Sequence, residues 1–264
     1  MISVIIPSYN PGDYFFDCLD SLNKQTLSKE FYSINIIFND TDDSIIEKFK
    51  DYIESISLNA IIFSLPKAGV SIARNYGIEK SSGSFICFLD DDDIISENYL
   101  ESLLEISNDN TIGVSNIMVF EENGKFYPYT RTLKSEINNC DVMQCKNLLS
   151  TVTAKIIPRN IIKDCRFNEN IKNGEDALFM FSISKRVYNI VSTNLNCFYY
   201  RRIRNDSAYY RRKKTSYYLI NTFYLYILYF FEYLASPFQY SGVFFLNRIL
   251  AVSKKLLLDL NIIK

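Results

Sequence analysis

The chain of 264 residues contains no histidine and no tryptophan. The absence of histidine excludes a Ser-His-Asp hydrolase, a Cys-His protease, a His-ligated zinc enzyme and a histidine general base. Acid–base or metal chemistry must therefore rest on Asp, Glu, Lys, Tyr or Cys. With only 8 glycines and 6 prolines, the chain is neither low-complexity nor fibrous. It also lacks a G-x-G-x-x-G segment, which argues against a dinucleotide oxidoreductase.

Charge of one sign is not in excess either, because 29 basic and 30 acidic residues leave a net charge of −1. Nucleic acid is therefore not an expected partner. The N-terminus has neither the basic region nor the apolar stretch of a signal peptide, and the six cysteines form no C-x-x-C pair. Both features predict a cytoplasmic location and free thiols. For the nearest pair, Cys140 and Cys145, a disulfide and a metal site are the alternatives.

The first half of the chain alternates between short apolar runs and helical patterns. The runs predict strands at 2–6, 34–38, 60–64 and 84–89. The helical patterns lie at 13–24, 45–56, 71–80 and from Ser96 to about residue 107. Such alternation predicts an α/β fold, with a mostly parallel sheet and helices on both of its faces.

The pattern changes after residue 110. Residues 112–120 and 125–130 flank an Asn-Gly pair and predict a hairpin. Further strands are expected within 152–157 and 187–200, and helices are expected at 175–186 and from 215 onward.

Polar residues follow each predicted strand of the first half, where ligands bind in open α/β sheets. The sharpest feature is the acid cluster Asp90–Asp93. Four adjacent carboxylates repel one another, and burial raises their pKa values unless a cation compensates. Their hard oxygens suit Mg²⁺ or Mn²⁺, above all when diphosphate oxygens complete the shell. Solvated acids at the start of a helix are the alternative.

Arg74, on the preceding helix, is a candidate partner for phosphates or for the acid cluster, with a surface salt bridge as its alternative.

Several segments together resemble family 2 glycosyltransferases with the GT-A fold. The matching segments are ISVIIPSYN at 2–10, IIFNDTDD at 36–43, KAGVSIARNYGI at 67–78, SGSFICFLDDDDII at 82–95, NGEDALF at 173–179 and, more weakly, YYRRIRNDS at 199–207. Each motif alone is weak, but their order and spacing match the family. The resemblance implies a nucleotide-sugar-binding half at 1–120, an acceptor-binding half of the same domain at 121–210, and a basic, aromatic helical tail at 211–264.

The resemblance also implies roles for single residues. Asp176 matches the general base that takes the proton of an acceptor hydroxyl as it attacks the anomeric carbon, with inversion. Asp92 and Asp93 match ligands of Mn²⁺ or Mg²⁺. The nucleotide sugar would be held by Pro7, Tyr9, Asp40, Lys67, Arg74, Asp90 and Asp91. The acceptor side would include Glu175, Arg202 and Ser207.

The implied reaction transfers one sugar from a nucleotide diphosphate sugar, with a UDP-sugar expected, to a hydroxyl of a glycan or lipid-linked acceptor in surface polysaccharide biosynthesis. The chain lacks the tryptophan-containing motif of processive members, so we expect single additions. The family's usual Asp-Asp-Gly-Ser is replaced by Asn39–Asp42. This departure keeps open a catalytically degenerate GT-A scaffold of a membrane glycan-assembly complex. A sugar-phosphate nucleotidyltransferase would need a Gly-rich loop where Pro7–Gly12 stands.

The C-terminal part joins a basic run to an aromatic one. Residues 201–214 carry seven basic residues and one acid, and 215–231 carry no charge and many aromatic residues. This uncharged stretch is shorter than a membrane span. The pattern fits peripheral contact of 211–250 with the inner face of the cell membrane. The alternatives are a core-packing helix or a homodimer surface, and the basic residues could instead contact an anionic or lipid-diphosphate acceptor.

Overall fold

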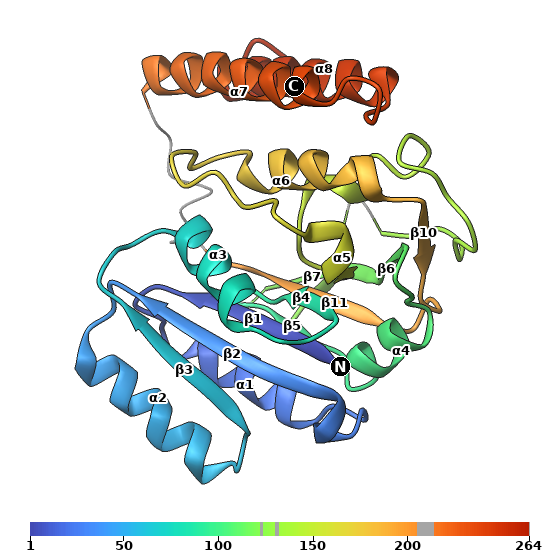
Figure 1. Ribbon diagram of the computed structural model, residues 1–264. Helices are drawn as coiled ribbons and strands as arrows, with labels where there is room; N and C mark the ends of the chain where they lie inside the picture. The colour runs from blue at the N-terminus through green and yellow to red at the C-terminus, as the bar shows by residue number, and fades with distance from the viewer. Residues whose placement is uncertain (122–123, 130–131, 205–213, 264) are drawn as a thin grey trace.

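The computed structural model describes residues 1–121, 124–129, 132–204 and 214–263 (Figure 1). Its strands are β1 Ile2–Ser8, β2 Tyr32–Asn39, β3 Ala60–Leu65, β4 Phe85–Phe88, β5 Ile94–Ile95, β6 Thr111–Val114, β7 Asn116–Glu121, β8 Phe126–Pro128, β9 Lys155–Pro158, β10 Asn189–Ser192 and β11 Phe198–Ile203. Its α-helices are α1 Tyr14–Asn23, α2 Asp43–Ser55, α3 Val70–Lys80, α4 Tyr99–Glu105, α5 Arg159–Ile162, α6 Glu175–Ile183, α7 Thr215–Ala235 and α8 Gly242–Asp259. Short 3₁₀ turns occupy Lys29–Phe31, Leu148–Ser150 and Ser184–Arg186.

A seven-stranded sheet in the order β10-β6-β9-β4-β1-β2-β3 forms the centre of the molecule. Strands β1 to β4 pair in parallel, and β9 runs antiparallel to both of its neighbours. The parallel strands therefore end at one common edge. This mostly parallel sheet confirms the predicted fold class.

Successive residues of the central strands alternate between two hydrophobic cores. In β1, Val4 and Ile6 join a core with α1, α2 and α4, whereas Ile5 joins a core with α3, α5 and α6 (Figure 1). Helices therefore cover both faces, as the sequence predicted. Gly77 of α3 lies so close to Ile5 and Ile37 that a Cβ atom there would clash, and this keeps α3 tight against the sheet.

The predicted hairpin exists, but its first strand is shorter than expected. β7 pairs antiparallel with β8, while the preceding residues form β6 in the main sheet. The apolar run 112–120 is divided at Ser115, whose backbone N–H donates to Ala154 O between the two strands. A single strand would have buried the whole run in one sheet.

Two other boundaries also differ from the prediction. Helix α4 begins at Tyr99 with Asn98 as its N-cap, and not at Ser96. Ser96 instead accepts a hydrogen bond from the N–H of Phe198, because the chain after Asp93 first pairs with β11 as strand β5. The region 187–200 holds β10 and the start of β11, which belong to different sheets.

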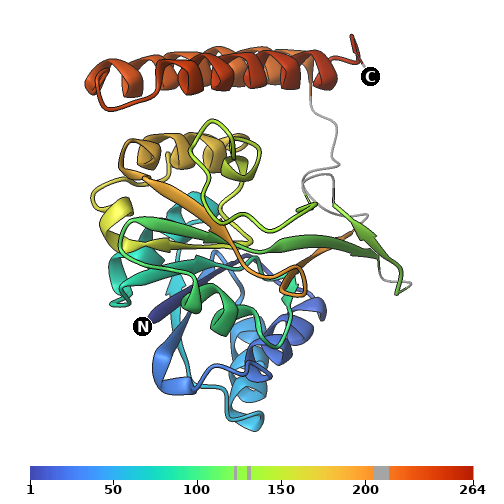
Figure 2. The same cartoon turned by 90° about the vertical axis from the view of Figure 1, so that its right-hand side faces the viewer.

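Helices α7 and α8 pack side by side as an outer layer over α6 (Figures 1 and 2). Their inner side chains pack around Phe181 of α6, whose ring stacks on Tyr240 and contacts Tyr229 edge-on. One face of these two helices therefore packs against the core, which was one of the alternatives to membrane contact. No helix among the described residues has the length and apolarity to cross a bilayer.

The prediction of free thiols is wrong for one pair, because Cys140 and Cys145 form a disulfide. The side chain of Asp141 accepts hydrogen bonds from the N–H groups of Met143 and Gln144, which turns the chain tightly between the cysteines. The two Cα atoms are 6.1 Å apart, within the range that a disulfide spans. The other four cysteines are free, as predicted.

Candidate active site

The ends of the parallel strands are tied together by one buried amide. Asn39, the last residue of β2, donates from Nδ2 to the carbonyl of Ser8 over 2.6 Å. Its Oδ1 accepts from the N–H of Gly69 over 2.8 Å, so the loop before α3 is fixed to β1 and β2. An aspartate could accept the second bond but could not donate the first. Asn39, which stands where the resembled family usually has Asp, therefore joins these strand ends in a way that Asp could not.

Arg74 joins two carboxylates that are far apart in the sequence. Its Nη1 donates to Asp176 over 2.7 Å and its Nη2 to Asp90 over 2.9 Å. The guanidinium is almost fully buried, 5.4 Å from the ring of Phe167. Burial disfavours its charge, but the nearby charges of Asp176, Asp90 and Glu175 outweigh burial and raise the pKa of Arg74. Arg74 is therefore a buried partner of the acid cluster, as one prediction had it, and it does not form the surface salt bridge that was the alternative.

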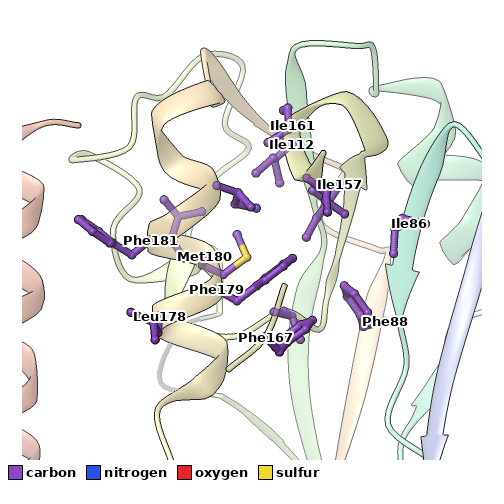
Figure 3. Close-up of a cluster of buried hydrophobic side chains, with 14 of the residues drawn as sticks. Ile86, Phe88, Ile112, Ile157, Ile161, Phe167, Leu178, Phe179, Met180 and Phe181 are labelled. Carbon is purple, nitrogen blue, oxygen red and sulfur yellow. The ribbon is translucent and has the colours of Figure 1, made fainter. Parts of the chain in front are cut away.

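Asp176 lies in the first turn of α6, directly after Gly174, which adopts the left-handed conformation with φ of 93°. Its Oδ2 accepts a hydrogen bond from the N–H of Val152 over 3.2 Å. Helix α6 is itself anchored by Phe179, whose ring stacks on Phe167 at 4.0 Å between centroids (Figure 3). Since Phe167 also lies under Arg74, one aromatic stack supports both partners of this ion pair.

The remaining acids of the cluster have different surroundings. The Asp91 carboxylate accepts from Ser8 Oγ over 2.7 Å, and Asp92 pairs with Arg204 over 3.1 Å. Asp93 is buried, and its two oxygens accept from the hydroxyl of Tyr199 and from the N–H of Arg202.

The predicted rise in pKa is present at Asp91, Asp92 and Asp93. Burial, followed by the charge of Asp92, raises the pKa of Asp91 to about 7. Burial and the charge of Asp90 raise the pKa of Asp92, against the effect of Arg204. Burial, together with neighbouring acids, raises the pKa of Asp93 as well. A site of this kind favours the approach of a cation.

Of the two predicted metal ligands, Asp92 is the partly exposed one, although its carboxylate already pairs with Arg204. Within the described part of the chain, no three metal-ligating side chains gather in one place. Mg²⁺ in particular is often held by one or two carboxylates together with substrate phosphates, so the residues present are compatible with it. The metal roles of Asp92 and Asp93 stay predictions, and the oxygens of Asp93 already accept hydrogen bonds within the protein.

The other residues predicted to hold a nucleotide sugar lie at the same sheet edge. Pro7 is buried near the end of β1, and Tyr9 follows it with its ring half-exposed. Asp40 is exposed at the end of β2 with φ of 50°, and its N–H donates to Leu65 O. Lys67 is exposed after β3, where it lines a cavity of about 650 Å³. Their predicted roles remain untested.

The residues predicted for the acceptor side do not all lie together. Glu175 precedes Asp176 and is partly buried. Arg202 donates to the carbonyl of Asp92 and to the carboxylate of Asp17 in α1, so its guanidinium supports the acid cluster from outside. Ser207 lies outside the described residues.

Sequence reasoning missed four residues that shape the site: Ser8, Asn39, Tyr199 and Arg204. Arg204 was part of the noted basic run, but only the fold brings it onto Asp92, 4.1 Å from the ring of Tyr14. Tyr199 was noted only as the first residue of the weakly matching segment 199–207. Its hydroxyl donates to Asp93 and accepts from the N–H of Asp90, which no spacing rule would have indicated.

Glu175 provides a pH-dependent test of this geometry. Burial and the charge of Asp176 raise its pKa to about 7 from an ordinary 4.5. The folded protein therefore binds more protons here than the unfolded chain between these values, so stability falls as the pH rises through this window. The variant Glu175→Gln should lack this loss and be up to about 3 kcal/mol more stable than the wild type at pH 8, but not at pH 4. Urea unfolding of both proteins from pH 4 to 8 measures the difference. If the difference in unfolding free energy between the two proteins stayed the same from pH 4 to 8, Glu175 would ionise as it does in water.

Chemically, the site joins a candidate base to a set of acids that can face a cation and a diphosphate. Asp176 and Asp90 share Arg74, so the two groups are held in one fixed arrangement. A carboxylate without a histidine partner can still accept a proton from a hydroxyl group.

The family model for glycosyl transferase family 2 matches residues 3–188. Among curated relatives, the minor teichoic acid biosynthesis protein GgaB of Bacillus subtilis is 28% identical over 78% of this chain and 23% of its own length. The poly(ribitol-phosphate) beta-glucosyltransferase of Bacillus spizizenii is 26% identical over 79% of this chain and 33% of its own length. The chain thus spans only a quarter to a third of these two relatives.

The fold is shared with a solved structure of Staphylococcus aureus TarS, residues 1–349, in complex with UDP-GlcNAc. The TM-score is 0.71 at 20% identity, and the match covers 86% of this chain and 66% of that one. This likeness confirms the expected GT-A fold.

Proposed function

The chain belongs to glycosyl transferase family 2, and we propose that it transfers a sugar from a UDP-sugar to a hydroxyl of a glycan or lipid-linked acceptor. The observation that carries this proposal is the bridge of Arg74 between Asp176 and Asp90. It joins Asp176 and Asp90, which the resemblance assigns as base and as first acid of the donor motif, although they are 86 residues apart in the chain.

In the proposed reaction, the donor lies along the sheet edge with its diphosphate towards Arg74 and the acid cluster. Asp176 accepts the proton of the acceptor hydroxyl while that oxygen attacks the anomeric carbon, and the bond from this carbon to the diphosphate oxygen breaks so that UDP leaves. Since the attack comes from the face opposite to UDP, the configuration inverts. The hydrogen bonds from Arg74 and Val152 orient the carboxylate for this step. A bound Mn²⁺ or Mg²⁺, held by Asp92 with Asp93 as the second predicted ligand, would supply positive charge for the leaving diphosphate.

The names of the relatives support a setting for this reaction. Two of them are named for teichoic acid or poly(ribitol-phosphate), and solved TarS structures contain UDP or UDP-GlcNAc. We therefore place the proposed transfer in the biosynthesis of a cell-surface polymer at the cytoplasmic side of the membrane. Titration of the folded chain with UDP-sugars, followed by an assay of UDP release with the donor that binds, tests the function. One UDP-sugar should bind and be turned over in the presence of an acceptor, and binding of none would contradict the proposal.

A second candidate is a scaffold that binds a nucleotide sugar without transferring it. Asn39 favours it, because an amide stands where the family usually has an acid. The amide, however, is fully used in joining strand ends, and Asp40 is still in place. Binding without any turnover in the presence of an acceptor would support the scaffold.

We also propose that the outer face of α7 and α8 rests on a lipid surface. On this face Ile220, Phe223 and Phe231 of α7 and Leu246 and Leu250 of α8 are all more than half exposed. A groove between the two helices is lined almost entirely by apolar atoms. Such a flat outermost layer, with Lys214 exposed at the start of α7, fits interfacial contact with anionic lipid.

The variant Phe231→Ser/Leu250→Ser should bind vesicles containing phosphatidylglycerol at least about tenfold more weakly, because burial of each side chain contributes roughly 1.5–3 kcal/mol. Vesicle sedimentation measures this, and Tyr188→Ser, a similarly exposed aromatic position on another face, is the control. A dimer that dissociates in the double variant, without any vesicle binding by the wild type, would assign this face to a second copy instead.

A further inference from the structure

A cavity of about 540 Å³ lies between the start of α6 and the inner face of α7 and α8. Its lining comes from segments far apart in the chain: Thr151 before β9, Gly174 and Ala177 around the first turn of α6, Tyr218 of α7 and Lys254 of α8 are among them. The layer of α7 and α8, which covers α6 in Figure 1, therefore also contributes the wall of this cavity.

This cavity lies beside the proposed base. Of its lining residues, Ala177 follows Asp176 in the chain and Gly174 lies two residues before it. Thr151, also in the lining, precedes Val152, whose N–H donates to the Asp176 carboxylate. The wall on the other side is held in place by α7. Asn221 donates to the carbonyl of Asn173, and Asn173 donates to the hydroxyl of Tyr217. A molecule in this cavity would thus lie next to the first turn of α6, which carries Asp176.

The lining carries a clear excess of positive charge. Arg201, Arg248, Lys254 and Lys255 line the cavity, and Asp259 is the one acid among the described lining residues, which leaves a net charge of +3. Asp259 pairs with Lys255 over 2.6 Å. A concave surface of one sign of charge raises the local concentration of ions of the other sign.

Two of these cations are held in fixed positions. Arg248 is almost fully buried, donates to the carbonyl of Lys146 and lies 4.8 Å from the ring of Phe244. Arg201 donates to the hydroxyl of Tyr129 over 3.2 Å, with its guanidinium above the same ring. Guanidinium groups that are already oriented bind phosphate with less loss of side-chain entropy than free ones.

We infer that this cavity binds a phosphate group of the acceptor, so that the acceptor is an anionic, phosphate-bearing polyol or glycan. The inference rests on the proposed function and names the acceptor class for the same site. The phosphate lies among Arg201, Arg248, Lys254 and Lys255, and a hydroxyl of the neighbouring unit reaches Asp176. The phosphate can belong to a polyol-phosphate polymer or to a lipid-linked diphosphate, which share this chemistry.

The test measures binding of two probes with UDP at saturation, so that the donor site is blocked. One probe is a synthetic glycerol-phosphate oligomer, and the other is a short-chain polyprenyl diphosphate in detergent. We expect at least one of them to bind, and the variant Lys254→Gln/Lys255→Gln to bind it about tenfold more weakly. The variant Lys254→Arg/Lys255→Arg should restore the affinity, because it restores the charge. The probe that binds identifies the source of the phosphate.

The control variant is Lys50→Gln/Lys80→Gln, which removes two lysines that also pair with neighbouring acids but lie on α2 and α3. It should bind the probe like the wild type. Binding of neither probe, or equal affinity of the wild type and the Lys254→Gln/Lys255→Gln variant, would overturn the inference. A separate titration with a UDP-sugar, without the probes, shows whether the proposed function itself holds.

Discussion

Replacing Asp176 by Asn should reduce sugar transfer at least about 100-fold, because the carboxylate that takes the acceptor proton is lost. Donor affinity should change by less than about twofold, since Asn keeps an oxygen that can accept from Arg74. The Asn side chain cannot accept from both Arg74 and Val152, so a loss of stability of about 1 kcal/mol is expected as well.

Release of UDP, measured in parallel with donor binding, separates these effects for Asp176→Asn. The matched control is Asp164→Asn, which removes an exposed carboxylate that also pairs with an arginine, Arg186, but lies outside the site. The control should retain transfer within about tenfold of the wild type. Normal turnover by Asp176→Asn would remove Asp176 from the role of base.

The second large effect is expected at Arg74. The variant Arg74→Gln leaves Asp90 and Asp176 without their shared cation, and removing one partner of a buried pair costs about 3–5 kcal/mol. Both carboxylates keep some exposure to water, so we expect about 3 kcal/mol and a fall of roughly 10 °C in the melting temperature. Transfer should also fall at least about tenfold, because only the N–H of Val152 then orients the Asp176 carboxylate.

Thermal unfolding checks this prediction against Lys48→Gln, which breaks an exposed ion pair with Asp13 and should cost less than about 1 kcal/mol. The triple variant Arg74→Gln/Asp90→Asn/Asp176→Asn should regain part of the stability lost in Arg74→Gln, because the unpaired charges are gone. If Arg74→Gln unfolds at the wild-type temperature, the bridge does not stabilise the fold.

The sequence predicted the parts of the fold that depend on short-range patterns. Apolar runs such as Ile2–Ile6 alternate faces within the sheet, and this pattern is visible without knowing the partners. It also placed Arg74 and the acids Asp90–Asp93 at one sheet edge, because parallel strands must end together. The proximity of Asp176, by contrast, came from the family resemblance alone.

What the sequence could not predict depends on pairings between distant segments. The burial of Asp93 requires Tyr199, which is 106 residues away, and the split at Ser115 requires β9. The cavity between α6 and α8 exists only after the C-terminal helices dock on Phe181. From the sequence, the aromatic tail could either pack against the core or lie on the surface. The structure shows both, because one face of α7 is buried and the other is exposed.

Calorimetric titration with UDP-, GDP-, CMP- and dTDP-sugars, with and without Mn²⁺, tests the central claim most directly. We expect one UDP-sugar to bind in the presence of Mn²⁺, and the same titration of a folded Asp92→Ala variant to show no metal-dependent binding. If the folded wild-type protein binds none of these donors under either condition, the account of a nucleotide-sugar site at this sheet edge is wrong.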